Sequence, residues 1–161
     1  SIEGVEPFLE MINVMKTSDE STTICLYVNS PGGDVNIAVQ IINTMRQSPA
    51  NIVTILESSC ASAATLIFLA GSKCVVNPNC TMMVHNYSQW AGGKGNEIVS
   101  QVEYQKKYFE KLSKDVYGSF LTEKEYDEMA DGKDFWFDSE NIIKRIKLRN
   151  KSQTKKTKRT T

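Results

Sequence analysis

The chain has 161 residues, of which 40% are hydrophobic and 24% charged, with 19 basic and 19 acidic side chains. This length and composition predict one globular domain with a single core. No run of about 18 apolar residues is present, which excludes a membrane-spanning helix. The first residues do not resemble an export signal, so we expect a cytoplasmic protein.

The zero net charge hides an uneven distribution of charge. Residues 144–161 contain nine Lys or Arg side chains and no acid, so residues 1–143 hold the other ten bases and all 19 acids. Residues 150–161 also lack apolar side chains that would offset the entropy cost of ordering. We therefore predict a folded domain over 1–146 and a basic, disordered tail over 147–161. The tail is interpreted as a solubilising extension, and an arm for nucleic acid or an acidic partner is the less favoured alternative.

The first half of the chain alternates extended and helical patterns. Residues 24–28 form a β-branched and aromatic run without polar alternation, which is typical of a strand covered on both faces. Apolar side chains at spacings of three and four predict a helix over 35–47, which Pro49 ends. Residues 52–56 are predicted as a second buried strand and 61–70 as a helix.

The second half predicts short strands and longer helices. In chain order, we expect strands at 74–76 and 81–84, a long amphipathic helix at 96–117, a helix with Thr122 as its N-cap, a strand at 134–137 and a helix at 139–146. The alternation of strands and helices indicates an α/β fold with a parallel sheet. The long helix follows a glycine-rich loop, so we expect it to project or to pair.

Three features indicate acyl-transfer chemistry. His85 is the only histidine, so it is the one imidazole available for acid–base catalysis near neutral pH. Ser62 lies 23 positions earlier in a segment of small residues, and residues 29–33 form a glycine turn whose N–H groups can bind an anion. Together these groups favour nucleophilic catalysis. The less favoured interpretations are that Ser62 is a packing residue and His85 a buried structural histidine.

The four cysteines, Cys25, Cys60, Cys74 and Cys80, lie in apolar segments without a Cys-x-x-Cys pair. We interpret them as free thiols of a cytosolic protein rather than as disulfides. With one histidine and no such pair, we predict no structural metal and no cofactor. Cys60 is a less favoured rival to Ser62 as the nucleophile.

Several short segments occur in an ordered series: Tyr-Val-Asn-Ser-Pro-Gly-Gly at 27–33, Ala-Ser-Ala-Ala at 61–64 leading to Leu-Ala-Gly at 69–71, Asn-Pro-Asn at 77–79 and Met-Met-Val-His-Asn at 82–86. In this order and near-spacing they resemble the ClpP family, the proteolytic subunit of the Clp protease. The likeness covers residues 24–143. It implies a ClpP/crotonase-like spiral of βαβ units with a protruding handle helix, which 96–117 matches.

The resemblance also implies a catalytic triad. Ser62 matches the family's nucleophile, His85 its general base, and Asp134, 49 positions further on, its orienting carboxylate. In such a triad the histidine takes the serine proton and returns it to the leaving amine, while the carboxylate fixes the imidazole tautomer. Asp131 and Asp138 are neighbouring alternatives to Asp134.

The implied oxyanion hole consists of backbone N–H groups. The resemblance points to the N–H of Ala63, directly after the nucleophile, and to that of Gly33 in the glycine turn. A serine at a strand-to-helix junction has an exposed hydroxyl and lies close to the N–H dipoles of the helix. These donors would stabilise the negative charge that develops on the substrate.

The function implied by the resemblance is that of a self-compartmentalising serine endopeptidase. Such a protein forms a homo-oligomer, a heptamer or a tetradecamer, and degrades unfolded polypeptides that an ATP-dependent AAA+ unfoldase delivers. The apolar stripe of 96–117 is then expected to form the seam between two rings. No Gly-x-x-x-x-Gly-Lys-Ser/Thr segment is present, so this chain is not expected to hydrolyse ATP itself.

Some residues depart from the family pattern. Ser-Ser-Cys-Ala at 58–61 replaces the usual segment before the nucleophile, His-Asn-Tyr at 85–87 replaces His-Gln-Pro, and a Lys-rich end replaces Gly-Leu-Val-Asp. These differences indicate a divergent member, with a virus-encoded origin as one interpretation. Two alternative functions stay open: a catalytically impaired ring subunit that regulates or scaffolds an active protease, and a crotonase-fold enzyme that acts on acyl-thioesters.

Overall fold

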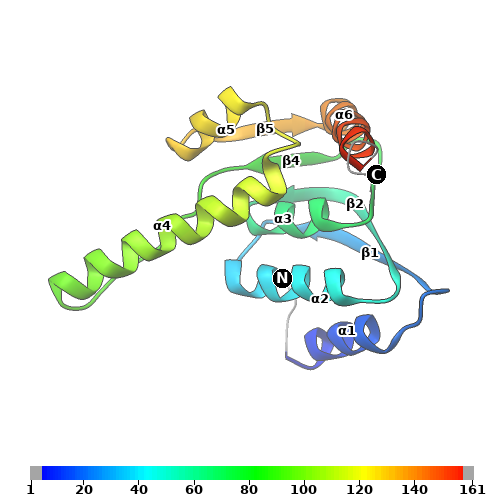
Figure 1. The fold of residues 1–161 in the computed structure, drawn as a ribbon, viewed down its shortest axis with the longest axis horizontal. Coiled ribbons are helices and arrows are strands. Elements are labelled where there is room, and N and C mark those ends of the chain that lie inside the picture. Colours follow the sequence, from blue (N-terminus) through cyan, green and yellow to red (C-terminus); the bar gives the residue numbers. More distant parts are fainter. Residues whose placement is uncertain (1–4, 158–161) are drawn as a thin grey trace.

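The computed structural model describes the backbone of residues 5–157 and the side chains of residues 6–151. Within the described backbone the chain forms six helices and five strands (Figure 1). In chain order these are α1 (Val5–Thr17), β1 (Thr23–Ser30), α2 (Val35–Gln47), β2 (Asn51–Ala61), α3 (Ala63–Ala70), β3 (Lys73–Val76), β4 (Thr81–Val84), α4 (Gly95–Tyr117), α5 (Glu123–Ala130), β5 (Phe135–Asp138) and α6 (Ser139–Thr157). The predicted α/β class is confirmed.

The five described strands form one sheet, in the order β1, β2, β4 and β5, with β3 also paired to β2. The first four strands in the chain run parallel, whereas β5 is antiparallel to β4. The strand β2 is 11 residues long because it has two partners on one side. Its residues Val53 to Leu56 pair with β3, and Ser59 to Ala61 pair with β4. Successive βαβ units therefore step along β2, as in the predicted spiral.

The core of the domain lies between the sheet and its helices. One cluster of buried side chains joins β2, α3, β4 and α6, and its fully buried members include Leu56, Phe68, Met82 and Ile142. Each such side chain contributes roughly 1.5–3 kcal/mol through burial. A smaller cluster joins α1, for which no element was predicted, to α2 and the first part of β2.

The structure corrects one expectation about β1. Its side chains alternate between the covered face and an exposed face, and Tyr27 on the exposed face is 61% accessible. The prediction of a strand covered on both faces is therefore wrong for the single chain. The reason is topological, because β1 lies at the edge of the sheet and the helices of the chain cover only one of its faces.

The long helix α4 extends away from the rest of the molecule (Figure 1). Its buried residues lie in its second half and include Phe109, Val116 and Tyr117. By contrast, Val99 is 57% exposed and Tyr104 is 67% exposed in the first half. The predicted long amphipathic helix is confirmed to within one residue of its start, and its apolar first half has no cover within the described chain.

The last helix, α6, extends into the segment predicted as a tail. The helix passes the predicted domain boundary at residue 147 and continues to Thr157, and 158–161 lie outside the described residues. Ile142 and Ile146 are buried in the core, and Nη1 of Arg149 donates a hydrogen bond of 2.7 Å to the carbonyl oxygen of Leu69. That carbonyl lies in the last turn of α3, where a cation is favoured by the helix dipole. None of the helices described is long and apolar enough to span a membrane.

Candidate active site

Ser62 occupies the junction between β2 and α3 in a strained conformation. Its φ of 56° and ψ of −133° lie in a region that side-chain-bearing residues rarely adopt, at a cost of about 1–3 kcal/mol. The helix predicted from residue 61 therefore begins only at Ala63, because Ala61 still belongs to β2. The Ser62 hydroxyl does not cap α3, so its Oγ is available for another partner.

Two backbone contacts hold Ser62 in place. Its N–H donates a 2.9 Å hydrogen bond to the carbonyl oxygen of Met83 on β4, and its own carbonyl accepts a 2.6 Å bond from the hydroxyl of Thr65. The Thr65 hydroxyl is also 2.6 Å from the buried hydroxyl of Tyr117 at the end of α4. Sequence reasoning missed Thr65, although a threonine in an otherwise apolar helix is a usable signal. The segment around Ser62 is thus anchored to both β4 and α4.

His85 follows β4 directly and reaches the serine. Its Nε2 lies 2.7 Å from Oγ of Ser62, within hydrogen-bond distance of the proton that a general base would take. The contact joins two residues 23 positions apart, because the ends of β2 and β4 are paired side by side. The structure therefore brings together the two residues that the sequence placed at the centre of the site.

The strand register places Asp134 next to His85, but no hydrogen bond joins their described side chains. The antiparallel ladder of β4 and β5 ends with Val84 opposite Phe135, so His85 and Asp134 occupy the next facing positions. The Asp134 side chain is exposed, and no hydrogen bond joins it to His85 within the part of the chain that the structure describes. The structure thus places the third residue of the predicted triad in register with His85 and does not show the predicted hydrogen bond.

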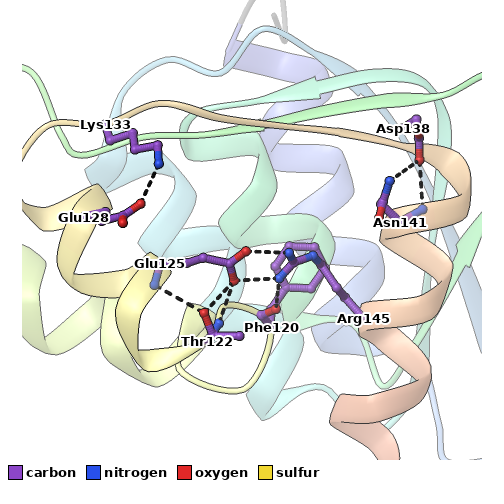
Figure 2. A network of polar contacts seen from close by, with 8 residues as sticks. All are labelled: Phe120, Thr122, Glu125, Glu128, Lys133, Asp138, Asn141 and Arg145. Carbon is purple, nitrogen blue, oxygen red and sulfur yellow. Dashed lines mark hydrogen bonds and ion pairs between the residues drawn. The ribbon is translucent and has the colours of Figure 1, made fainter.

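The carboxylates of Asp131 and Asp138, the alternatives to Asp134, lie at other positions in the fold. Asp138 is at the opposite end of β5, where its carboxylate accepts hydrogen bonds of 2.8 and 2.9 Å from the backbone and side chain of Asn141 (Figure 2). The bonds from Asn141 lower the pKa of Asp138. Asp131 caps the end of α5. Among these three carboxylates, Asp134 is the one in register with His85.

The glycine turn packs directly against Ser62. A Cβ atom on Gly32, whose φ is +102°, would lie 2.7 Å from both the Ala61 carbonyl oxygen and the Ser62 Cβ, so only glycine fits there. Sequence reasoning selected its neighbour Gly33 as a donor and gave Gly32 no role of its own. The backbone N–H groups of Gly33 and Ala63 make no hydrogen bond among the described residues. They are the two predicted oxyanion donors, and the close approach of Gly32 brings their segments together.

A cavity of about 680 Å³ begins at this glycine turn and at Ala63. It continues between α1, β1, α2 and α3, and its apolar lining includes Phe8, Met11, Ile37, Ile41 and Ile67. An apolar cavity beside an acyl-transfer site is suited to an apolar substrate side chain.

The rival nucleophile Cys60 is buried in the core next to the site. Burial raises the pKa of its thiol to about 12, so the reactive thiolate is not formed near neutral pH. All four cysteines are free, as predicted. Within the described residues, no group of three or more His, Cys, Asp or Glu side chains is arranged to hold a metal ion.

A serine and a histidine in contact, on a strained junction beside two unpaired backbone N–H groups, are the parts of a serine hydrolase. A family model described as Clp protease matches residues 5–145. The chain belongs to the Clp protease family, a family of serine endopeptidases.

Several curated proteins are similar to the chain. It is 29% identical over 147 residues to ATP-dependent Clp protease proteolytic subunit 1 of Leifsonia xyli subsp. xyli, a match that covers 88% of this chain and 73% of that protein. It is 32% identical over 133 residues to the subunit 1 of Streptomyces avermitilis, covering 79% of this chain and 59% of that protein. It is 28% identical over 126 residues to the chloroplastic ATP-dependent Clp protease proteolytic subunit 3 of Arabidopsis thaliana, a match that covers 74% of this chain and 40% of that protein.

Proposed function

We propose that this chain is an active serine endopeptidase subunit in which Ser62 is the nucleophile and His85 the general base. The observation that carries the proposal is the 2.7 Å contact between Ser62 Oγ and His85 Nε2 at a strained strand-to-helix junction. In the reaction, Nε2 takes the hydroxyl proton while Oγ forms a bond to the peptide carbonyl carbon. The electron pair of the carbonyl moves onto its oxygen, which the N–H groups of Ala63 and Gly33 stabilise.

The remaining steps return the enzyme to its starting state. The tetrahedral intermediate collapses with cleavage of the C–N bond, and His85 gives its proton to the departing amine. Water then attacks the acyl-enzyme, His85 takes a proton from that water, and Ser62 Oγ recovers a proton as the acid leaves. Asp134 is the carboxylate that orients the imidazole through Nδ1. The cavity next to Ala63 accepts an apolar side chain of the substrate.

A fluorophosphonate probe tests the nucleophile. We expect labelling of Ser62 that disappears in Ser62→Ala and in His85→Ala and that persists in Ser58→Ala, an exposed serine in the same segment. Identification of the labelled peptide by mass spectrometry separates Ser62 from the other serines. Labelling that survives in Ser62→Ala would disprove this assignment.

The second candidate is a catalytically impaired ring subunit that regulates or scaffolds an active protease. The exposed Asp134, which makes no hydrogen bond to His85 in the described structure, favours this alternative. The two candidates predict different results for the assembled protein. An impaired subunit assembles but neither binds the probe nor cleaves peptides.

We further propose that the chain works as a homo-oligomer, a heptamer or a tetradecamer. The support is the apolar first half of α4, where Val99, Val102 and Tyr104 are 57%, 40% and 67% exposed. Such a stripe on a projecting helix is stable when a second copy covers it. Native mass spectrometry should give seven or fourteen times the 18.1 kDa subunit mass. In a tetradecamer, Val102→Glu should release heptamers and Lys106→Glu should not, whereas a monomer in the wild type would exclude an enclosed chamber.

The proposed substrates are unfolded polypeptides, delivered by an AAA+ unfoldase. Two similar proteins are named as subunits of an ATP-dependent protease, and this chain has no phosphate-binding motif of its own. An enclosed chamber would admit extended chains and exclude folded ones. The expected result is cleavage of a permanently unfolded protein without ATP and no cleavage of the same protein when folded. The free cysteines fit a reducing compartment such as the cytoplasm.

A further inference from the structure

The turn that carries Asp134, residues 131–134, is built as a helix C-cap. At the end of α5, the N–H of Gly132 donates a 3.0 Å bond to the carbonyl of Met129, and the N–H of Lys133 donates a 2.9 Å bond to that of Glu128. Gly132 has a φ of +102°, which this motif requires at that position. The turn therefore has a fixed shape and directs the chain from α5 into β5.

Two side-chain contacts of Lys133 also hold this turn. Nζ of Lys133 lies 2.5 Å from Oε2 of Glu128 (Figure 2). It also lies 4.9 Å from the centre of the Phe135 ring. The hydrogen bond from Lys133 lowers the pKa of Glu128. Both contacts lie on the chain immediately beside Asp134, and they keep the turn closed on α5.

Asn86 connects this turn to the segment that follows His85. Its Nδ2 donates a 2.8 Å hydrogen bond to the carbonyl oxygen of Ala130, and its Oδ1 accepts a 2.9 Å bond from the N–H of Tyr87. Ala130 is the last residue of α5, so its carbonyl has no partner within the helix. One carboxamide thus fixes both the chain after His85 and the end of the helix before Asp134.

These contacts bracket the pair formed by His85 and Asp134. On one side is the last pair of the ladder, Val84 and Phe135, and on the other is the bond from Asn86 to Ala130. No ladder pairing continues past Val84, so the ladder does not fix the separation of the two strand ends beyond this point. The hydrogen bond from Asn86 to Ala130 fixes the separation of the segment after β4 from the turn before β5.

We propose that Asn86 is a positioning residue that sets the approach of Asp134 to Nδ1 of His85. The inference rests on the proposed function, since it gives Asp134 the orienting role. In the structure this bond is made while Asp134 is still exposed, so it fixes the strand ends before the carboxylate reaches the imidazole. Removal of the Asn86 carboxamide frees the strand end from the turn and makes that approach less frequent. The effect acts through Asp134, not through Ser62, whose contact with His85 lies on the other side of the ring.

The sole histidine provides a direct test of this role. In the assembled protein labelled with ¹⁵N-histidine, every imidazole signal comes from His85. We expect a solvent-protected Nδ1–H signal in the wild type that is lost in Asn86→Ala and in Asp134→Asn, and kept in the control Ser88→Ala, an exposed neighbour. Asn86→Asp keeps the acceptor for Tyr87 but loses the donor to Ala130, so it should also lose the signal. A signal that persists in Asn86→Ala, or that is absent from the wild type, would overturn the proposal.

A kinetic cycle adds a readout that general destabilisation would not reproduce. Asn86→Ala should lower the rate of fluorophosphonate labelling by roughly tenfold to a hundredfold, as expected for a displaced catalytic group. In the Asp134→Asn background the same change should have no further effect, because the interaction it supports is already absent. Multiplicative losses would contradict the proposal. If Asn86→Ala does not fold, Glu128→Gln, which weakens the other contact of the turn, should give a partial loss of the signal.

The two proposals can fail separately. A wild-type Nδ1–H signal that depends on Asn86, together with no labelling of Ser62, would disprove the peptidase function and retain the positioning role. Labelling of Ser62 that is independent of both Asn86 and Asp134 would support the peptidase function and disprove the positioning role.

Discussion

The two neighbours of His85 are held in different ways. Ser62 lies at the inner end of β2, where hydrogen bonds to Met83 and Thr65 fix its backbone and its Oγ contacts Nε2. Asp134 lies at the start of the edge strand β5, is exposed, and makes no hydrogen bond to the imidazole in the described structure. The proposed nucleophile and base are therefore set by the core of one chain, whereas the proposed carboxylate depends on a surface turn.

This difference indicates which half of the site is adjustable. The ends of β2 and β4 cannot separate without breaking the parallel pairing of the central sheet. The turn at 131–134 is held by a few polar contacts, each worth roughly 0.5–1.5 kcal/mol. Changes in assembly or sequence are thus expected to act on the Asp134 side first.

The largest effects are expected on the Ser62 side. Ser62→Ala and His85→Ala should each lower kcat/KM for a peptide substrate by at least about 10⁴-fold, because removal of either group ends nucleophilic attack. Cys60→Ala should retain most of the rate, because its buried thiol is protonated at neutral pH. Steady-state kinetics on the assembled protein check all three. Activity that follows Cys60 instead would reverse the assignment of the nucleophile.

The Asp134 side should give a smaller loss of rate. Asp134→Asn is expected to lower kcat/KM by roughly 10²- to 10⁴-fold, because the imidazole loses its orienting partner. Asp138→Asn is the matched control, since this carboxylate bonds Asn141 at the far end of β5. We expect it to lower the melting temperature and to leave the rate unchanged. Equal losses of rate in the two variants would remove the distinction between the carboxylates.

A substitution in the glycine turn should change both the activity and the stability of the protein. Gly32→Ala places a Cβ atom 2.7 Å from Ala61 and Ser62 at a φ of +102°, and we expect a loss of about 1–3 kcal/mol together with most of the activity. Gly95→Ala at the start of α4 is the control, because a Cβ there would meet no atom within 4 Å. Denaturant unfolding and labelling of Ser62 measure both effects. An active, stable Gly32→Ala protein would show that this close approach is dispensable.

The smallest effect is expected from the ion pair between α5 and α6, the two helices on either side of β5 in the chain. Glu125 of α5 and Arg145 of α6 form an ion pair at 2.6 Å (Figure 2), and hydrogen bonds from Arg145 lower the pKa of Glu125 from 4.5 to about 2. A carboxyl whose pKa is lowered on folding stabilises the protein above its ordinary pKa. This stabilisation is lost as the pH falls from about 4.5 towards 2.

Substitution of Glu125 should therefore change the pH dependence of stability. Glu125→Gln should reduce the free energy of unfolding at pH 7 by about 1–3 kcal/mol and make the loss of stability between pH 5 and pH 2 shallower. Glu123→Gln, an exposed residue of the same helix, serves as the control. Urea unfolding at several pH values provides the measurement. A pH profile identical to that of the wild type would show that the pair does not contribute.

Elements with a strong local pattern were predicted accurately. The helix at 35–47 and the strand at 81–84 have the predicted bounds, and Thr122 is the predicted N-cap, whose side chain accepts from the N–H of Glu125. The helix α1 was missed, although Phe8, Met11 and Met15 have helical spacing. The full length of β2 was not predictable in this way, because its second half is a strand through its pairing with β4 and, at Cys60, with β1.

The sequence by itself predicted which groups would perform the chemistry, since a single imidazole, a serine among small residues and a glycine turn restrict the choice to His85, Ser62 and residues 29–33. These are properties of residue type and local spacing. The tertiary structure decided which carboxylate is in strand register with His85, that Ser62 takes a positive φ, and that α6 continues past residue 147. Each of these depends on strand register or on packing between distant segments, and such contacts leave no periodic pattern in the local sequence.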